Sequence, residues 1–174
     1  TNPAQASEEV GELLKGKNKK NVDLVTSVAH VYLDAGKLTE AQEYLAMAKK
    51  ANNKDPKVSV LEGDIALAQK NIGQACQLYE QAIYFDPNCK DAYLKYAQAY
   101  KSASPALAIE KLEQLKAVDP NCLEADRELA EVYYSSNRFG KAAEMYAKFI
   151  DTPLATEDDM LKYAFALFLN HDFE

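Results

Sequence analysis

The residues that could carry out chemistry are few and lie far apart in the sequence. The chain has two histidines, His30 and His171, and most of its length separates them. A metal site or a histidine-based triad therefore has no second histidine close by in sequence. The surrounding residues predict that His30 lies on a helix surface or in a groove, and that His171 lies in a turn.

The tightest acidic cluster is formed by Glu157, Asp158 and Asp159. Two such carboxylates could in principle act as general acid and general base. Acidic side chains are also favoured in the first turn of a helix, where they interact with its dipole. We expect this structural role, with Thr156 and Asp159 forming a capping box at the start of the helix.

The cysteines and glycines also lack a catalytic pattern. Cys76, Cys89 and Cys122 show no Cys-x-x-Cys spacing, and no glycine-rich phosphate loop follows a strand pattern. Cys89 and Cys122 each follow an Asp-Pro-Asn triplet, which places them on equivalent corners of neighbouring units. Packed helices lie about 8–10 Å apart, beyond the roughly 7 Å limit for a disulfide, so we predict free thiols. The sequence predicts no enzyme, no cofactor and no bound metal.

Composition and charge restrict the classes of partner. The chain of 174 residues is 48% hydrophobic, with a formal net charge of −7. An acidic protein is a poor ligand for a phosphate backbone, so we expect no nucleic acid. No apolar run approaches the ~20 residues of a bilayer span, so we expect no membrane insertion. The chain is predicted to be soluble, and the sequence leaves a cytoplasmic or a periplasmic location open.

One short pattern recurs at a nearly fixed interval. A small residue is followed three positions later by an aromatic or another apolar residue, and successive copies begin 34, 34, 33 and 34 residues apart. The pairs are Ala29 with Tyr32, Gly63 with Ala66, Ala97 with Tyr100, Ala130 with Tyr133, and Ala164 with Leu167. A period of this length indicates one supersecondary unit stacked on itself. We therefore expect function on the surface of the stack.

The sequence of each unit predicts two antiparallel helices. Apolar residues at helical spacing predict first helices over 22–34, 56–69, 90–102, 123–136 and 157–170, each of the first four followed by a turn and a second helical run. Gly36 can take the left-handed conformation that ends a helix, and Ser104 before Pro105 is predicted to cap one. Residues before proline leave the helical region, so Asp-Pro and Thr-Pro pairs mark the boundaries between units.

The pattern resembles the tetratricopeptide repeat family. That family combines a small residue on the first helix with an alanine, an aromatic four positions later, and a closing proline. Two units match as follows: Gly63, Ala75, Tyr79, Ala82 and Pro87; and Ala130, Tyr133, Ala142, Tyr146 and Pro153. The resemblance implies an all-α fold, a right-handed superhelical α-solenoid of antiparallel helix pairs with about four full repeats and partial ones at both ends.

The expected organisation follows the proline boundaries. Residues 1–21 are predicted to be a capping helix or the second helix of a preceding repeat, followed by a basic linker with Lys15, Lys17, Lys19 and Lys20 that could alternatively meet an acidic partner. The expected repeats are 22–55, 56–89, 90–122 and 123–156, and 157–174 would be the first helix of a truncated fifth repeat. Such an end leaves Leu161, Phe165, Phe168 and Leu169 partly uncovered and predicts self-association there.

The resemblance also implies where a partner binds, because first helices line a concave groove in this family. Residues three and four apart share one side of a helix. The predicted groove residues are His30, Val60, Asp64, Leu67, Leu94, Gln98, Lys101, Arg127, Glu131 and Tyr134. We expect a peptide or helix of a partner protein there, with a purely solvated face as the alternative.

The predicted function is therefore a protein-interaction or scaffolding module. Two alternatives stay open: a regulatory segment of a larger enzyme, and an RNA-binding helical repeat. The second would need a basic groove, whereas the expected groove is acidic.

Overall fold

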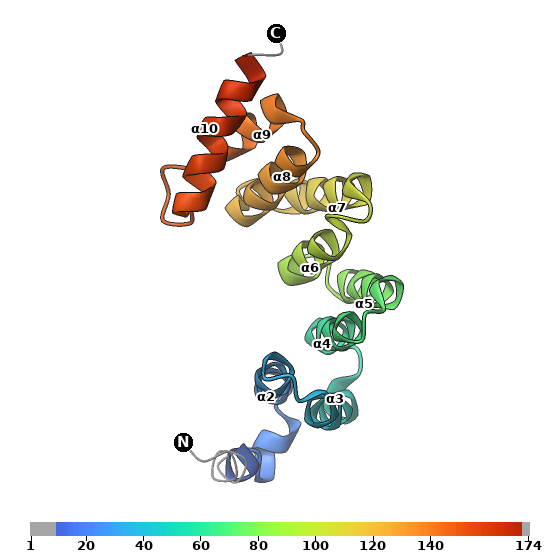
Figure 1. Ribbon diagram of the computed structural model, residues 1–174. Coiled ribbons are helices and arrows are strands. Elements are labelled where there is room, and N and C mark those ends of the chain that lie inside the picture. Colours follow the sequence, from blue (N-terminus) through green and yellow to red (C-terminus); the bar gives the residue numbers. More distant parts are fainter. Residues whose placement is uncertain (1–9, 172–174) are drawn as a thin grey trace. The chain divides into compact units, whose positions relative to one another are not determined.

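The computed structural model describes residues 10–171 of the chain, and no strand occurs in this part (Figure 1). The predicted all-α solenoid of helix pairs is confirmed as a fold class. The chain divides into two compact units, Thr1–Ala92 and Tyr93–Glu174. The predicted repeat boundaries remain predictions.

The first unit contains a short 3₁₀ helix and two helix pairs. Its elements are η1 (Gly16–Lys20), α2 (Val22–Asp34), α3 (Leu38–Asn52), α4 (Pro56–Ala68) and α5 (Ile72–Phe85). Helix α2 packs on α3, α4 packs on α5, and α2 also contacts α4. The first helices of the two pairs therefore lie next to each other.

Local sequence explains where these helices begin and end. The side chains of Asn21, Asp55 and Asn71 accept hydrogen bonds from backbone amides in the first turns of α2, α4 and α5, at 3.2, 3.0 and 3.3 Å. Gly36 follows α2 with a φ of +72°, the left-handed conformation predicted for it. These signals are local, which is why they can be read before any packing is known.

A close helix contact forms the centre of the first unit. Gly63 on α4 lies under the ring of Tyr79 on α5, and a Cβ on Gly63 would stand 2.5 Å from a ring carbon. Both residues are buried. Gly63 is therefore glycine because nothing larger fits beneath the ring.

The second unit begins within helix α6 (Lys90–Tyr100) and continues through four more helices. These are α7 (Pro105–Val118), α8 (Leu123–Ser135), α9 (Phe139–Tyr146) and α10 (Glu157–His171). Helix α8 contacts α7 and α9, and α9 contacts α10. The Lys111 ammonium of α7 lies 4.7 Å from the centre of the Tyr96 ring of α6. The largest fully buried side chains here are Tyr146, Phe149, Leu112, Leu115 and Val132.

One sequence expectation about helix ends holds in part, and another is wrong. Ser104 is the N-cap residue of α7 and Pro105 follows it at the helix start, as predicted, but the Ser104 side chain makes no capping hydrogen bond. Helix α10 runs through His171, so this residue does not lie in a turn. The last residues of α10 contain neither proline nor glycine, and nothing local stops the helical hydrogen bonding there.

Candidate functional site

In the first unit, the predicted groove position holds a polar cluster that joins three helices. The Asp64 carboxylate of α4 lies 2.9 Å from Nε2 of His30 on α2, and the Tyr79 hydroxyl of α5 donates to its other oxygen at 2.8 Å. Burial raises the pKa of Tyr79, and the adjacent Asp64 carboxylate raises it further. The tyrosine therefore stays a hydrogen-bond donor, and Asp64 ties both helix pairs together.

The imidazole of His30 is surrounded by acceptors. Its Nδ1 lies 2.9 Å from the Thr26 carbonyl oxygen, one turn earlier on α2, while Nε2 faces Asp64. The His30 ring therefore contacts an acceptor with each of its nitrogens, one on its own helix and one on α4.

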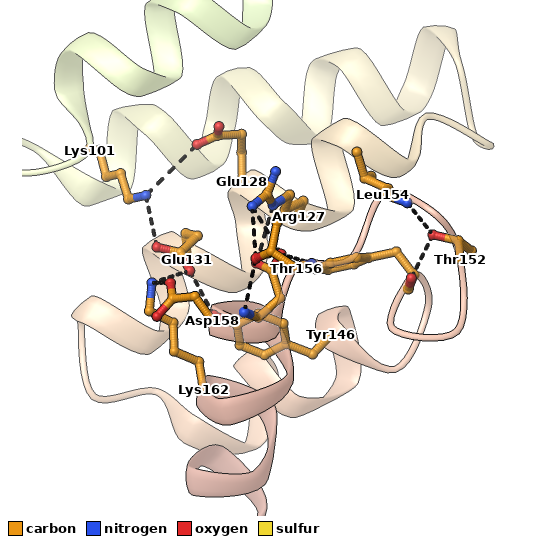
Figure 2. Close-up of polar contacts among 12 residues, drawn as sticks. Lys101, Arg127, Glu128, Glu131, Tyr146, Thr152, Leu154, Thr156, Asp158 and Lys162 are labelled. Atoms are coloured by element: carbon orange, nitrogen blue, oxygen red, sulfur yellow. Dashed lines mark hydrogen bonds and ion pairs between the residues drawn. The ribbon is translucent and has the colours of Figure 1, made fainter.

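In the second unit, the same kind of cluster is built with lysines. The Tyr146 hydroxyl of α9 donates to Glu131 of α8 at 2.9 Å, while Lys101 and Lys162 approach the same carboxylate at 3.2 and 2.8 Å (Figure 2). Burial raises the pKa of Glu131, but the hydrogen bonds from Lys162 and Tyr146 and the charge of Lys101 outweigh it, so the net pKa is lowered. Glu131 therefore stays ionised and bridges two lysines.

Arg127, one turn earlier on α8, pairs with the start of α10. Its guanidinium lies 3.0 Å from the carboxylate of Asp159, which is 1% exposed. Asp159 also accepts from the backbone and hydroxyl of Thr156 at 2.8 and 2.6 Å, and its own amide donates to that hydroxyl at 3.3 Å. The predicted capping box is confirmed. Burial raises the pKa of Asp159, but Thr156 and Arg127 outweigh it and lower the net pKa.

The acidic cluster of the last helix thus consists of structural partners. Asp159 pairs with Arg127, and Asp158 pairs with Lys162 at 2.7 Å. Across residues 10–171, no group of three His, Cys, Asp or Glu side chains is arranged to hold a metal ion. The three cysteines are free thiols, as predicted. No helix in the described part of the chain is both long and apolar enough to cross a bilayer.

The remaining predicted groove residues differ in what they offer to a partner. Leu67 and Gln98 are exposed, Leu94 is half-buried, and Gln98 donates to Glu128 at 2.7 Å. The half-buried Tyr134 ring packs edge-on against Phe139 and Tyr146. Val60 is 2% exposed and belongs to the core, because α4 is buried around most of its circumference. Its inclusion among the groove residues is corrected on that ground.

Three exposed hydrophobic side chains of α10 occupy the repeat positions of predicted groove residues, although the sequence analysis did not assign them to the groove. Leu161, Phe165 and Phe168 are 56%, 49% and 63% exposed. Each lies one period of 34 residues after a predicted groove residue of α8, in the order Arg127, Glu131 and Tyr134. The repeat period itself was the signal that could have found them. The sequence analysis instead grouped them with Leu169 as an uncovered end that self-associates.

The other exposed apolar residues of α10 lie on a different side of the helix. Met160 and Leu167 are 52% and 40% exposed. Their counterparts 34 residues earlier, Asp126 and Tyr133 of α8, are both buried. On α8 this side is covered by neighbouring elements, and Asp126 pairs with Lys116 of α7 at 2.7 Å. Helix α10 therefore presents two separate apolar faces.

These features define the class of protein as a helical repeat whose first helices carry a polar and apolar face. A tetratricopeptide repeat model matches residues 29–93 and 98–155, more than half of the chain. The chain belongs to the tetratricopeptide repeat family, whose fold is that of a protein-interaction or scaffold module.

Solved structures share this fold at low sequence identity. A thermophilic tetratricopeptide repeat protein from Thermus thermophilus has a TM-score of 0.74 and 20% identity, over 91% of this chain and 87% of that one. PilW, a widely conserved type IV pilus biogenesis factor, has a TM-score of 0.76 and 20% identity, over 95% and 79%. Pseudomonas aeruginosa pilF has 0.76 and 18%, over 97% and 77%. A search of the curated proteins found no match.

Proposed function

We propose that this chain binds a peptide or helical segment of a partner protein on the face of its first helices and carries out no catalysis itself. The proposal combines the family assignment with the side chains that this face presents in each unit. In the first unit they are His30, Asp64 and Leu67. In the second unit they are Leu94, Gln98, Lys101, Glu131 and Tyr134, with Arg127 acting mainly as an internal ion-pair partner.

The observation that carries this proposal is the apolar run on α10. Leu161, Phe165 and Phe168 expose large hydrophobic surfaces in the same repeat register as three predicted groove residues of α8. Exposed apolar clusters rimmed by polar groups are typical of protein-binding surfaces. The ion pairs from Lys162 to Glu131 and from Asp159 to Arg127 hold α10 beside α8. A partner segment would place apolar side chains on α10 and polar groups beside Lys101 and Glu131.

The test uses selection of peptides on the immobilised chain from a displayed random library. We expect enriched sequences with large apolar side chains, and we expect their affinity to fall about tenfold or more in a Leu161→Ser, Phe165→Ser variant, because such anchors dominate peptide binding. Exposed positions are chosen because Arg127 and Tyr134 are internal contacts, and changing them would disturb the fold. Selected peptides that bind this variant as tightly as the parent chain would refute the assignment of the face.

A matched control lies on the other apolar face of α10. A Met160→Ser, Leu167→Ser variant removes comparable apolar surface from the same helix while leaving the groove register intact. We expect it to retain peptide binding. The same pair of variants tests self-association: loss of a light-scattering dimer in the control variant alone would assign self-association to the second face, separately from peptide capture.

The two alternative functions make different demands on the chain. An RNA-binding repeat would require affinity for single-stranded RNA that falls steeply with salt, and the net charge of −7 opposes this. A regulatory role within a larger enzyme would use the same binding face. The peptide test therefore addresses the function that both protein-binding interpretations share.

A further inference from the structure

A second surface lies in the first unit, away from the face of the first helices. Two adjoining hollows occur where the residues around η1 meet α3, and they share Lys19 and Met47. One is lined by Lys19, Lys20, Met47, Lys50 and Ala51, and the other extends past Tyr44 to Leu14 and Lys15. The floor is apolar, because Met47, Ala51 and Tyr44 are partly buried side chains of α3.

The rim of these hollows is basic, and most of its lysines lack an ion-pair partner among the described residues. Among the described residues, no Asp or Glu lines either hollow, and Lys19, Lys20 and Lys50 form no ion pair. Lys15, at the far side of the second hollow, pairs with Glu12, and Lys49 outside the hollows pairs with Glu62 of α4 at 2.6 Å. Glu43, beside Tyr44 on α3, contributes to the raised pKa of that tyrosine after burial and Tyr32.

The positive charge of this rim contrasts with the net charge of −7 of the whole chain. Like charges gathered around a concave surface repel one another and concentrate a positive potential there. A bound anion relieves that repulsion, while the acidic remainder of the protein repels extended polyanions such as nucleic acid or an anionic bilayer. A short acidic segment avoids this repulsion because it covers only the hollow.

We propose that this surface binds an acidic segment of a partner protein. Its Asp or Glu side chains would pair with Lys19, Lys20 and Lys50, and an aliphatic side chain would lie on Met47 and Ala51. This site is distinct from the face of the first helices, so a partner could be held at two places on the same chain. Binding at the first site would raise the effective concentration of the partner at the second and so increase the overall affinity.

The test measures fluorescence anisotropy of a short dye-labelled peptide of alternating Glu and Leu with the full chain. We expect saturable binding that weakens as salt is raised, because exposed charge pairs are screened. A Lys19→Gln, Lys50→Gln variant should bind about tenfold more weakly. A Lys54→Gln, Lys70→Gln variant carries the same net charge, with both changes at exposed lysines outside the hollows, and should bind like the parent.

Two comparisons complete the design. A peptide of alternating Glu and Ser should bind more weakly than the Leu peptide, since it lacks contact with the floor, and an Ala51→Glu variant should lose binding that an Ala46→Glu variant keeps. Equal binding by the two lysine variants would overturn the site. Binding to phosphatidylserine vesicles without binding to the peptide would also overturn it and would favour a lipid surface. Neither outcome affects the peptide selection on α10.

Discussion

The two units join their helices through similar polar clusters, which differ in one of their members. Asp64 and Glu131 occupy the same repeat position, and each accepts a hydrogen bond from a tyrosine 15 residues later, Tyr79 or Tyr146. That bond joins the two helices of one pair in both units. The side chain that reaches this carboxylate from a neighbouring element differs, because it is His30 in the first unit and Lys101 with Lys162 in the second.

This difference shows which members of the polar cluster can vary between repeats. The carboxylate and tyrosine form a link within a pair, so both must keep their positions relative to the buried helix contact. The side chain from the neighbouring element lies at the edge of the next pair and needs only to reach the carboxylate. The two units should therefore respond differently to mutation.

The largest expected effect is at Gly63, the small residue beneath the Tyr79 ring. Gly63→Ala would place a Cβ 2.5 Å from the Tyr79 ring, whose hydroxyl is held by Asp64, so the helices must separate. We expect a loss of about 1–3 kcal/mol in the free energy of unfolding. The equivalent residue in the second unit is Ala130, and Ala130→Gly should cost about 1 kcal/mol through helix propensity. Urea denaturation of both variants measures the contrast, and equal small effects would show that the α4 and α5 contact is not tight.

The next effect concerns the two carboxylates. Glu131→Gln leaves Lys101 and Lys162 without their shared counter-charge, and we expect it to destabilise the chain by about 1–2 kcal/mol at neutral pH. Asp64→Asn should cost less, because its amide oxygen can still accept from Tyr79 or His30. Thermal unfolding compares the two, with exposed Glu144→Gln as a control. A larger loss at Asp64 would contradict the importance assigned to the lysines.

The Glu131→Gln variant also tests how the stability of the fold depends on pH. Because the folded-state pKa of Glu131 is lowered, its contribution is fully present above the unfolded carboxyl value of about 4.3 and is lost as pH falls through the folded value. Between these two values the unfolded chain binds more protons, so stability decreases with acidification. We expect Glu131→Gln to show a shallower decline than the parent chain in this window when unfolding is followed by circular dichroism. If the stability of the variant and of the parent chain declined in parallel, Glu131 would not contribute to acid unfolding.

The smallest expected effect is at an exposed link between repeats. Lys57 lies 2.5 Å from Asp23, with both side chains well exposed, and Asp23 raises the pKa of Lys57 through this hydrogen bond. Surface ion pairs of this kind are worth about 0–1 kcal/mol, so Lys57→Gln should scarcely change the midpoint of urea denaturation. A loss as large as that of Glu131→Gln would mean that exposed and half-buried links contribute alike.

Much of the fold could be predicted because its signals are local or periodic. Gly36, Asp55 and Thr156 act through backbone conformation and capping within a few residues, and the recurrence of Ala and Gly marks the contact within each pair. Ser104 shows the limit of such reasoning, because its side chain makes no capping bond in a position that favours one.

Less of the candidate site could be predicted, because a helical period assigns a face and not its neighbours. It placed His30, Asp64, Arg127 and Glu131 in one register, yet it gave no indication that Tyr79 and Tyr146 reach across to the carboxylates. It also placed Val60 at a surface, where packing buries it.

The sequence by itself determined the repeating helix pair, since spacing and small residues set which helix surfaces can approach. Only the tertiary structure decided which charges are used internally, as with Arg127 and buried Asp159, and which surfaces stay open, as with Phe165 and the lysines around Met47. The physical reason is that burial and ion pairing depend on side chains supplied by other helices, over distances in sequence that no local pattern encodes.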